Sequence, residues 1–460
     1  MVQLVCLIGC SNGKLEPWHT ARLTQDFRAG DAETFAAYLA IEDQAFAELD
    51  EEVYAKVPTG PEFALVRYSR GSLSDPDTFP QNYNRSYELE AGAPRGGVLM
   101  IHGMSDSPYS MWAIGESLHE AGFHVVNLRL PGHGTAAAAL TRARWQDFAA
   151  AVELAMAHLD SVVGDRAVHL IGFSNGAPVA VNYALDSLDD RRLPVPGSLI
   201  LIAPAIGVTP VAGLAGFKNF LGGIPGLAGL RYTSMRPAFD PFRYGAFPTN
   251  GATQTHKLTR RIANGITRLE QNGLGAKMPP VLVVTSVVDN TVSNDAIIDR
   301  LLGRLPDNGN ELLLFDVNRV AATSSIVIPN PGPFANRVRT EVSLPFAVTL
   351  VHNASAVSRS VVASHRPAFA ETFRAPVAMD AEWPPGVVSL SHVGLTFAAD
   401  DPLYGRFPPE EDGRLFLGSI NVAGERGILR VPDNWFTRQR HNPFYDYMEV
   451  RLVEWCLAIE

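Results

Sequence analysis

The chain has 460 residues, of which 46% are hydrophobic and 19% are charged, and its formal net charge is -10. This length predicts one large domain with insertions or two domains, and the composition is typical of a globular protein that buries a sizeable core. The acidic balance argues against non-specific binding to nucleic acid and against a basic membrane-binding surface.

The start of the chain is almost wholly apolar over residues 1–9 and continues into Cys10. The sequence Leu7-Ile8-Gly9-Cys10 resembles a bacterial lipobox, in which cleavage precedes a cysteine that is then lipidated. This resemblance predicts a leader over residues 1–10 and a protein anchored through Cys10 on the periplasmic side of a cell envelope. The run is short and lacks a preceding Lys or Arg, so the alternative is a first β-strand in a cytoplasmic protein.

Residues 11–92 form a mixed N-terminal extension. The spacing of apolar residues, with many acidic residues between them, predicts a helix over residues 31–54. Residues 68–87 are rich in Pro, Asp, Asn and Ser, which predicts a loop. No repeat or low-complexity tract occurs in the chain.

From Gly97 onward, apolar strands alternate with amphipathic helices. The predicted strands cover residues 98–101, 124–130, 167–173, 198–203, 280–286 and 311–315. The predicted helices cover residues 110–121, 145–163 and 175–188. This alternation predicts an α/β fold over residues 93–460, with a mostly parallel sheet covered by helices on both faces.

Two long stretches interrupt this alternation. Residues 204–255 are rich in Gly, Pro and aromatic residues, and residues 318–387 are rich in Pro, Arg, Ser and Val. Long segments of this kind in a compact domain are usually functional lids or small subdomains. We therefore predict a lid over residues 204–255 and a second insertion over residues 318–387, whose structure the pattern does not assign.

The strongest chemical signal is the sequence Gly172-Phe173-Ser174-Asn175-Gly176, which matches Gly-x-Ser-x-Gly between a predicted strand and a predicted helix. A serine on such a sharp turn projects its hydroxyl above the carboxyl edge of the sheet, and small residues two positions away avoid clashes. We predict that Ser174 is a nucleophile; the alternative is a glycine-bounded turn with an incidental serine.

Two backbone N–H groups are candidates for an oxyanion hole. Met104 follows the strand that ends in Ile101-His102-Gly103, and Asn175 follows the nucleophile. We interpret His102 as a residue that orders this loop. His133, in Leu130-Pro131-Gly132-His133-Gly134, precedes Ser174 in the sequence and is interpreted as structural.

In sites built on a Gly-x-Ser-x-Gly turn, the acid and the base follow the serine in the chain, so both are expected downstream of Ser174. Asp289 follows the strand 280–286 and is favoured as the acid over Asp295. His392, in Leu390-Ser391-His392-Val393-Gly394, is favoured as the base over His352, while His365 and His441 are further candidates. The separation of 103 residues between Asp289 and His392 is unusually long for this kind of site.

The order Ser174, Asp289, His392, with the Leu-Pro-Gly-His-Gly turn, resembles the α/β-hydrolase superfamily in its monoglyceride-lipase-like or serine-aminopeptidase-like branch. The resemblance covers about residues 97–316 and the His392 segment, and it implies a Ser-His-Asp triad that cleaves small carboxylic esters. Phe217, Phe220 and other apolar residues of the predicted lid suggest a hydrophobic acyl group. The alternatives are an aminopeptidase or amidase on the same fold, or a non-catalytic binding lipoprotein.

The resemblance implies no metal and no organic cofactor. The sequence His119-Glu120-Ala121-Gly122-Phe123-His124 nearly matches the zinc-protease motif, but its second His is one position late and Gly122 breaks the helix. We expect no nucleic-acid partner, and no signal points to an obligate protein partner.

Overall fold

The structure, a computed structural model, describes residues 15–207, 228–289, 291–320, 333–385, 387–409, 413–418 and 440–459. The predicted leader with Cys10 lies outside these ranges, as do residues 208–227 of the predicted lid and 321–332 of the predicted insertion. None of the helices in the described ranges combines the length and the apolar character that a membrane-spanning helix requires.

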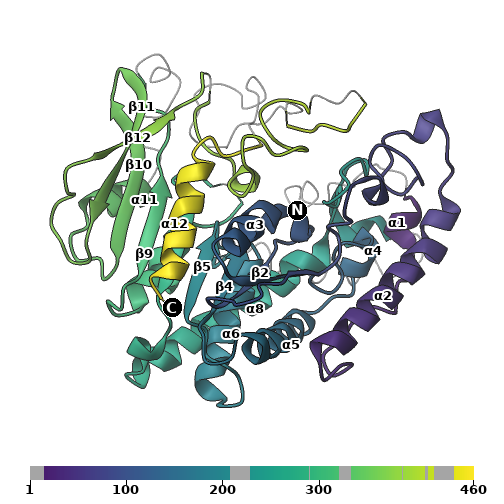
Figure 1. The fold of residues 1–460 in the computed structure, drawn as a ribbon, viewed down its shortest axis with the longest axis horizontal. Helices are drawn as coiled ribbons and strands as arrows, with labels where there is room; N and C mark the ends of the chain where they lie inside the picture. The colour runs from purple at the N-terminus through teal and green to yellow at the C-terminus, as the bar shows by residue number, and fades with distance from the viewer. Residues whose placement is uncertain are drawn as a thin grey trace, which may run out of the picture.

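A single large sheet organises the molecule (Figure 1). Its described strands run in the order β1-β3-β2-β4-β5-β8-β9-β10-β11-β12. The neighbours from β3 to β10 pair in parallel, whereas β1, β11 and β12 pair antiparallel. The bounds are β1 (Tyr87–Leu89), β2 (Gly97–Ile101), β3 (His124–Leu128), β4 (Val168–Phe173), β5 (Ser198–Ile202), β8 (Val281–Ser286), β9 (Glu311–Phe315), β10 (Ala347–Ser355), β11 (Ser358–Arg366) and β12 (Val377–Glu382).

Helices cover both faces of this sheet, which confirms the predicted fold class. One face packs on α5 (Trp145–Val163), α6 (Gly176–Asp189), α8 (Thr249–Gln271) and α9 (Asp295–Arg300). The other face packs on α3 (Trp112–Glu120) and the C-terminal α12 (Tyr445–Leu457). Because side chains alternate along a strand, Leu99 and Ile101 enter the first core while Val98 and Met100 enter the second. This two-sided burial explains why the central strands are continuous apolar runs.

The N-terminal extension packs on the same framework. Its helix α2 (Phe35–Glu52) contacts α5, and Phe35 and Tyr38 belong to the first core. β1 lies at the end of the segment expected to be loop and pairs with β3. Two short helices also contact each other: α1 (Pro17–Thr20) in the extension and α4 (Ala137–Leu140) in the following domain.

The predicted insertion at residues 318–387 extends the sheet. After α11 (Pro333–Thr340), the strand β10 pairs in parallel with β9, and β11 and β12 follow as antiparallel neighbours. Figure 1 shows these strands in green at the end of the molecule opposite the purple α2. The long separation between Asp289 and His392 is therefore occupied in part by three additional strands.

The described part of the predicted lid contains a small hairpin. β6 (Tyr232–Met235) pairs antiparallel with β7 (Ala246–Pro248) in a separate two-stranded sheet. α8 begins at Thr249, directly after β7. The lid itself remains a prediction, because only residues 204–207 and 228–255 of it are described.

Candidate active site

Ser174 lies on the turn between β4 and α6, where the sequence pattern places it. Its φ of 52° falls in the left-handed region, which residues other than glycine rarely adopt. Two hydrogen bonds to the strand-end segment after β5 hold this backbone: the Ser174 N–H donates to the Ile202 carbonyl (2.9 Å) and the Ala205 N–H donates to the Ser174 carbonyl (3.0 Å). The residue is half-buried.

The glycines two positions before and after Ser174 are required by close packing. A Cβ atom on Gly172 would lie 2.6 Å from Cα of Ala177, and a Cβ atom on Gly176 would clash with the carbonyl of Ile101. The turn therefore brings α6 against β2 and β4 more closely than any side chain allows. This close approach is the physical reason for the Gly-x-Ser-x-Gly pattern.

An imidazole and a carboxylate form a hydrogen-bonded chain with Ser174. The Nε2 atom of His392 lies 2.9 Å from Oγ of Ser174, and its Nδ1 atom lies 2.6 Å from Oδ2 of Asp289. An ionised carboxylate only accepts hydrogen bonds, so Nδ1 carries the proton and Nε2 of the neutral ring accepts the Ser174 hydroxyl proton. Oδ1 of Asp289 accepts the N–H groups of Thr291 (2.7 Å) and Val292 (3.1 Å), which fixes the carboxylate.

The loop that carries His392 is held by one hydrogen bond within its turn and by one from a distant segment. The Oγ atom of Ser391 accepts the Gly394 N–H (3.1 Å), and the Asn442 N–H donates to the carbonyl of Phe397 (2.8 Å). The His392 ring lies 5.4 Å from the Phe173 ring, and the residue is only 3% exposed. The imidazole is therefore fixed in the orientation that both hydrogen bonds require.

The competing histidines are engaged elsewhere. In His352 on β10, Nδ1 contacts the Asn353 carbonyl (2.8 Å) and Nε2 contacts Oγ of Ser364 (2.9 Å). His365 contacts Thr349 within the same sheet extension. The structure thus brings His392, and neither of these two, to Ser174. His441 precedes Asn442, in the segment that anchors the His392 loop.

The two upstream histidines order the loops after β2 and β3. The Leu130 N–H donates to Nε2 of His102 (3.0 Å), and Nδ1 of His102 contacts the Gly103 carbonyl (2.8 Å). His133 is also buried, with its ring 4.8 Å from that of His102. Burial lowers the pKa of His133 to about 3, so this ring stays neutral at ordinary pH.

The candidate oxyanion donors are the backbone N–H groups of Met104, which follows Gly103, and of Asn175, which follows Ser174. Gly103 approaches so closely that a Cβ atom on it would lie 3.2 Å from Cβ of Ser174, and Asn175 is the next residue after Ser174. Among the described residues, neither the Met104 nor the Asn175 backbone N–H donates to a protein acceptor. Both donors therefore remain available at this point of the site.

Thr255 is a positioning residue that the sequence pattern does not reveal. From α8, its hydroxyl donates to Oδ1 of Asn175 (2.7 Å). Asn175 and Thr255 are 80 residues apart in the chain, and both are buried. The second turn of α8 thus fixes the side chain that follows Ser174.

Asp401 is a second anchor that the sequence pattern did not single out for this role. It accepts the Tyr109 hydroxyl (3.1 Å) and the Trp112 indole N–H (3.3 Å), and it also accepts the N–H groups of Leu403 and Tyr404. Burial raises the pKa of this carboxyl group above its usual range. These bonds fasten the segment after His392 to the start of α3.

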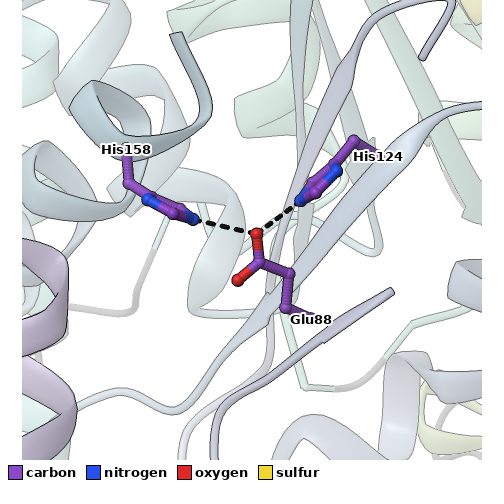
Figure 2. Close-up of side chains that lie close together, drawn as sticks. All are labelled: Glu88, His124 and His158. Carbon is purple, nitrogen blue, oxygen red and sulfur yellow. Dashed lines mark hydrogen bonds and ion pairs between the residues drawn. The ribbon is translucent and has the colours of Figure 1, made fainter. Parts of the chain in front are cut away.

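One group of metal-type ligands occurs in the described ranges, at Glu88, His124 and His158 (Figure 2). Nε2 of His124 and Nε2 of His158 both contact Oε1 of Glu88, the latter at 2.9 Å. The Ala91 N–H donates to Nδ1 of His124 (3.4 Å), so in the neutral ring Nε2 carries the proton and donates to Glu88. A metal would require the lone pair on that nitrogen. As arranged here, the three side chains form a hydrogen-bonded bridge between β1, β3 and α5.

The contribution of this bridge to the free energy of unfolding is expected to depend on pH. Burial opposes ionisation of Glu88, but the hydrogen bonds from His124 and His158 outweigh it and lower the pKa of this carboxyl group. A lowered pKa stabilises the fold above the unfolded-state value and loses that effect as the pH falls through the folded value. We expect Glu88→Gln to lower the free energy of unfolding by about 1–2 kcal/mol at pH 7, measured by urea denaturation.

The difference between wild type and Glu88→Gln should shrink as the pH falls below about 4. Glu90→Gln is the matched control, because Glu90 is exposed and two residues away, and it should leave the free energy of unfolding nearly unchanged. A difference that stayed constant down to low pH would contradict a role for the ionised Glu88.

Two comparisons of this sequence with known proteins point to the same family. Residues 98–337, just over half of the chain, match the model of the alpha/beta hydrolase family. The chain is 28% identical over 127 residues to the thermostable monoacylglycerol lipase of Bacillus sp. (strain H-257), covering 27% of this chain and about half the length of that relative.

Solved structures with detectable similarity include a chain from the work on LipS and LipT, two metagenome-derived lipolytic enzymes; it is 20% identical with a TM-score of 0.39, covering 50% of this chain and 87% of that one. The monoacylglycerol lipase of Paleococcus ferrophilus is 20% identical with a TM-score of 0.36, covering 50% of this chain and 89% of that one. Taken with the sheet topology described above, the match over residues 98–337 shows that the chain belongs to the alpha/beta hydrolase family.

Proposed function

We propose that this protein is a serine hydrolase that cleaves carboxylic esters through an acyl-enzyme. The observation that carries this proposal is the chain of hydrogen bonds from Ser174 through His392 to Asp289, with distances of 2.9 and 2.6 Å. A hydroxyl is a weak nucleophile unless an adjacent base takes its proton, and this arrangement supplies that base and a carboxylate to orient it. The Bacillus relative is a monoacylglycerol lipase, which supports ester cleavage as the proposed reaction.

The proposed reaction has two steps. Oγ of Ser174 attacks the acyl carbonyl carbon while Nε2 of His392 takes the hydroxyl proton, and the N–H groups of Met104 and Asn175 stabilise the oxyanion. The alcohol leaves with the proton from His392, and an acyl ester remains on Ser174. Water then attacks this ester with the same base, which releases the carboxylic acid and restores the serine.

We also propose that the acyl group of the substrate ester is apolar. Phe239 and Phe247, from the described part of the predicted lid, line a cavity together with Val393 and Phe397 from the His392 loop. Phe242, by contrast, stacks on Tyr109 at 4.3 Å and packs inside the molecule. Phe217 and Phe220 lie outside the described residues.

A fluorophosphonate probe tests the nucleophile directly. The probe phosphonylates an activated serine with loss of fluoride, and we expect peptide mass spectrometry to find the adduct on Ser174, because His392 activates that hydroxyl. Heat-unfolded protein is the control and should not react. An adduct on another serine, or no adduct on the folded protein, would contradict the proposed site.

A further inference from the structure

A cavity of about 240 Å³ includes in its lining two residues that are adjacent in the chain to residues of the candidate active site. Ser105 directly follows Met104, and Val393 directly follows His392. Besides its phenylalanines, this cavity is lined by three arginines, Arg236, Arg243 and Arg440. An arginine-rich wall is unexpected in a pocket that serves only an apolar acyl chain.

Arg243 keeps its hydrogen-bond donors available. Its Nε atom lies 3.8 Å from Oδ1 of Asp106, which is too far for a hydrogen bond, and its side chain is 21% exposed. Within the described ranges, no other acceptor contacts this guanidinium group. A guanidinium group has five N–H donors in a planar arrangement that fits a carboxylate or a phosphate.

Arg440, which also lines the cavity, repeats this arrangement. Its Nη1 atom lies 4.0 Å from Oδ2 of Asp240, and its side chain is 17% exposed. Its guanidinium carbon lies 5.6 Å from the centre of the Tyr404 ring. The described residues again supply no acceptor at hydrogen-bond distance.

The neighbouring carboxylates do not neutralise these arginines closely. Both oxygens of Asp240 lie 2.6 Å from the Tyr404 hydroxyl, and Oδ1 also accepts the N–H groups of Phe242 and Arg243, each at 3.1 Å. The Asp106 carboxylate reaches Arg243 only at 3.8 Å, and of these two acids only Asp240 lines the cavity beside its three arginines. The cavity wall therefore carries an excess of positive charge.

Arg129, an arginine with a purely structural role, has much closer hydrogen-bond partners than Arg243 and Arg440. Arg129 is fully buried and donates to both oxygens of Asp26, at 3.1 and 2.6 Å, and to the His133 carbonyl at 2.7 Å. Buried guanidinium groups need such close partners to offset the loss of hydration. Arg243 and Arg440 lack them and line the cavity that also includes Ser105 and Val393, the chain neighbours of Met104 and His392.

We propose that the substrate ester carries an anionic group, a carboxylate or a phosphate, and that Arg243 and Arg440 bind this group while Ser174 attacks the ester. This inference rests on the proposed ester hydrolysis and adds the charge of the substrate to it. An aliphatic acyl chain that ends in a carboxylate satisfies both the apolar and the cationic parts of the wall.

Two esters that differ in one group test the inference. Mono-4-nitrophenyl succinate carries a carboxylate where 4-nitrophenyl butyrate carries a methyl group, and the leaving group is the same. We expect Arg243→Met and Arg440→Met each to lower the ratio of kcat/KM for the succinate ester to kcat/KM for the butyrate ester by about tenfold or more. Arg268→Met, at an exposed arginine on α8, is the control and should leave this ratio unchanged.

Inhibition of butyrate-ester turnover distinguishes the two anions. Propionate and methyl phosphate are added at an ionic strength kept constant with sodium chloride, and the stronger competitive inhibitor identifies the group that the cavity binds. Either result supports the inference if inhibition weakens in both arginine variants. Equal inhibition of wild type and variants would overturn it.

Folding and the proposed function are controlled separately. Arg243→Met strands the buried Asp106, so the double variant Arg243→Met/Asp106→Asn is measured as well, and fluorophosphonate labelling of Ser174 reports that each variant is folded. An unchanged ester ratio in variants that still hydrolyse 4-nitrophenyl butyrate would overturn the anionic substrate alone. A wild type that hydrolyses neither ester and does not react with the probe would overturn the proposed function and, with it, this inference.

Discussion

Ser174→Ala should reduce the turnover of 4-nitrophenyl butyrate by at least about a thousandfold. The substitution removes the one hydroxyl that is hydrogen-bonded to His392 and leaves the hydrogen bond between His392 and Asp289 in place. A residual rate above the uncatalysed reaction is expected from the oxyanion donors and from substrate binding alone. The measurement is kcat/KM from the release of 4-nitrophenolate.

The control for Ser174→Ala is Ser161→Ala, which changes the same side chain at an exposed position near the end of α5. This control should keep the rate of the wild type. Thermal unfolding should show that Ser174→Ala is at least as stable as the wild type, because alanine lacks the polar atom held at the site. Equal rates for wild type and Ser174→Ala would exclude the serine mechanism.

His392→Ala is expected to reduce the same rate by a similar factor, at least about a thousandfold. Without the imidazole, the Ser174 hydroxyl has no base, and the Asp289 carboxylate loses the group that it orients. When two residues act as one unit, the rate losses caused by substituting each of them are not additive. The double variant Ser174→Ala/His392→Ala should therefore have about the same rate as either single variant.

His352→Ala is the matched control for the base. It removes an imidazole whose two ring nitrogens contact Asn353 and Ser364 in the sheet extension, so the rate should change little. A large loss of activity in His352→Ala together with full activity in His392→Ala would reverse the assignment. A double variant much slower than both single variants would show that Ser174 and His392 act independently.

The long separation between Asp289 and His392 now has a structural explanation. β10, β11 and β12 continue the sheet beyond β9, and the chain then returns to the carboxyl end of β4, where Ser174 lies. The sheet extension thus lengthens the chain between Asp289 and His392 but leaves His392 beside Ser174. The buried Trp383, which directly follows β12, packs against Phe444 at 4.9 Å and helps to fix this return.

The sequence pattern identified the central elements because their signals are local. The predicted helix 145–163 and the predicted strand 311–315 have the same bounds in the structure. Both are determined by apolar periodicity, and the strands of the central sheet are buried on both faces. The helix expected from residue 110 begins at Trp112, because residues 108–111 form a 3₁₀ turn, and the strand expected to reach residue 130 ends at Leu128.

The outer strands of the sheet extension, β11 and β12, were not predicted because they are only partly buried. In β12 every residue is exposed or half-buried, and β11 alternates irregularly between buried and half-buried positions. Strands at the end of a sheet need no continuous apolar run, so their sequences resemble loops. The edge strand β1 was missed for the same reason, since all three of its residues are half-buried.

By itself, the sequence determined the α/β fold class and the turn that carries Ser174, and it made Asp289 and His392 the favoured candidates for the proposed acid and base, because each of these predictions depends on residues adjacent in the chain or on the strand that precedes them. Tertiary structure alone decided which histidine reaches Ser174, that Thr255 fixes Asn175, and that Arg243 and Arg440 face one cavity. These relations join residues 80 to 218 positions apart. No local pattern encodes such contacts, because they arise only when the sheet and its helices pack together.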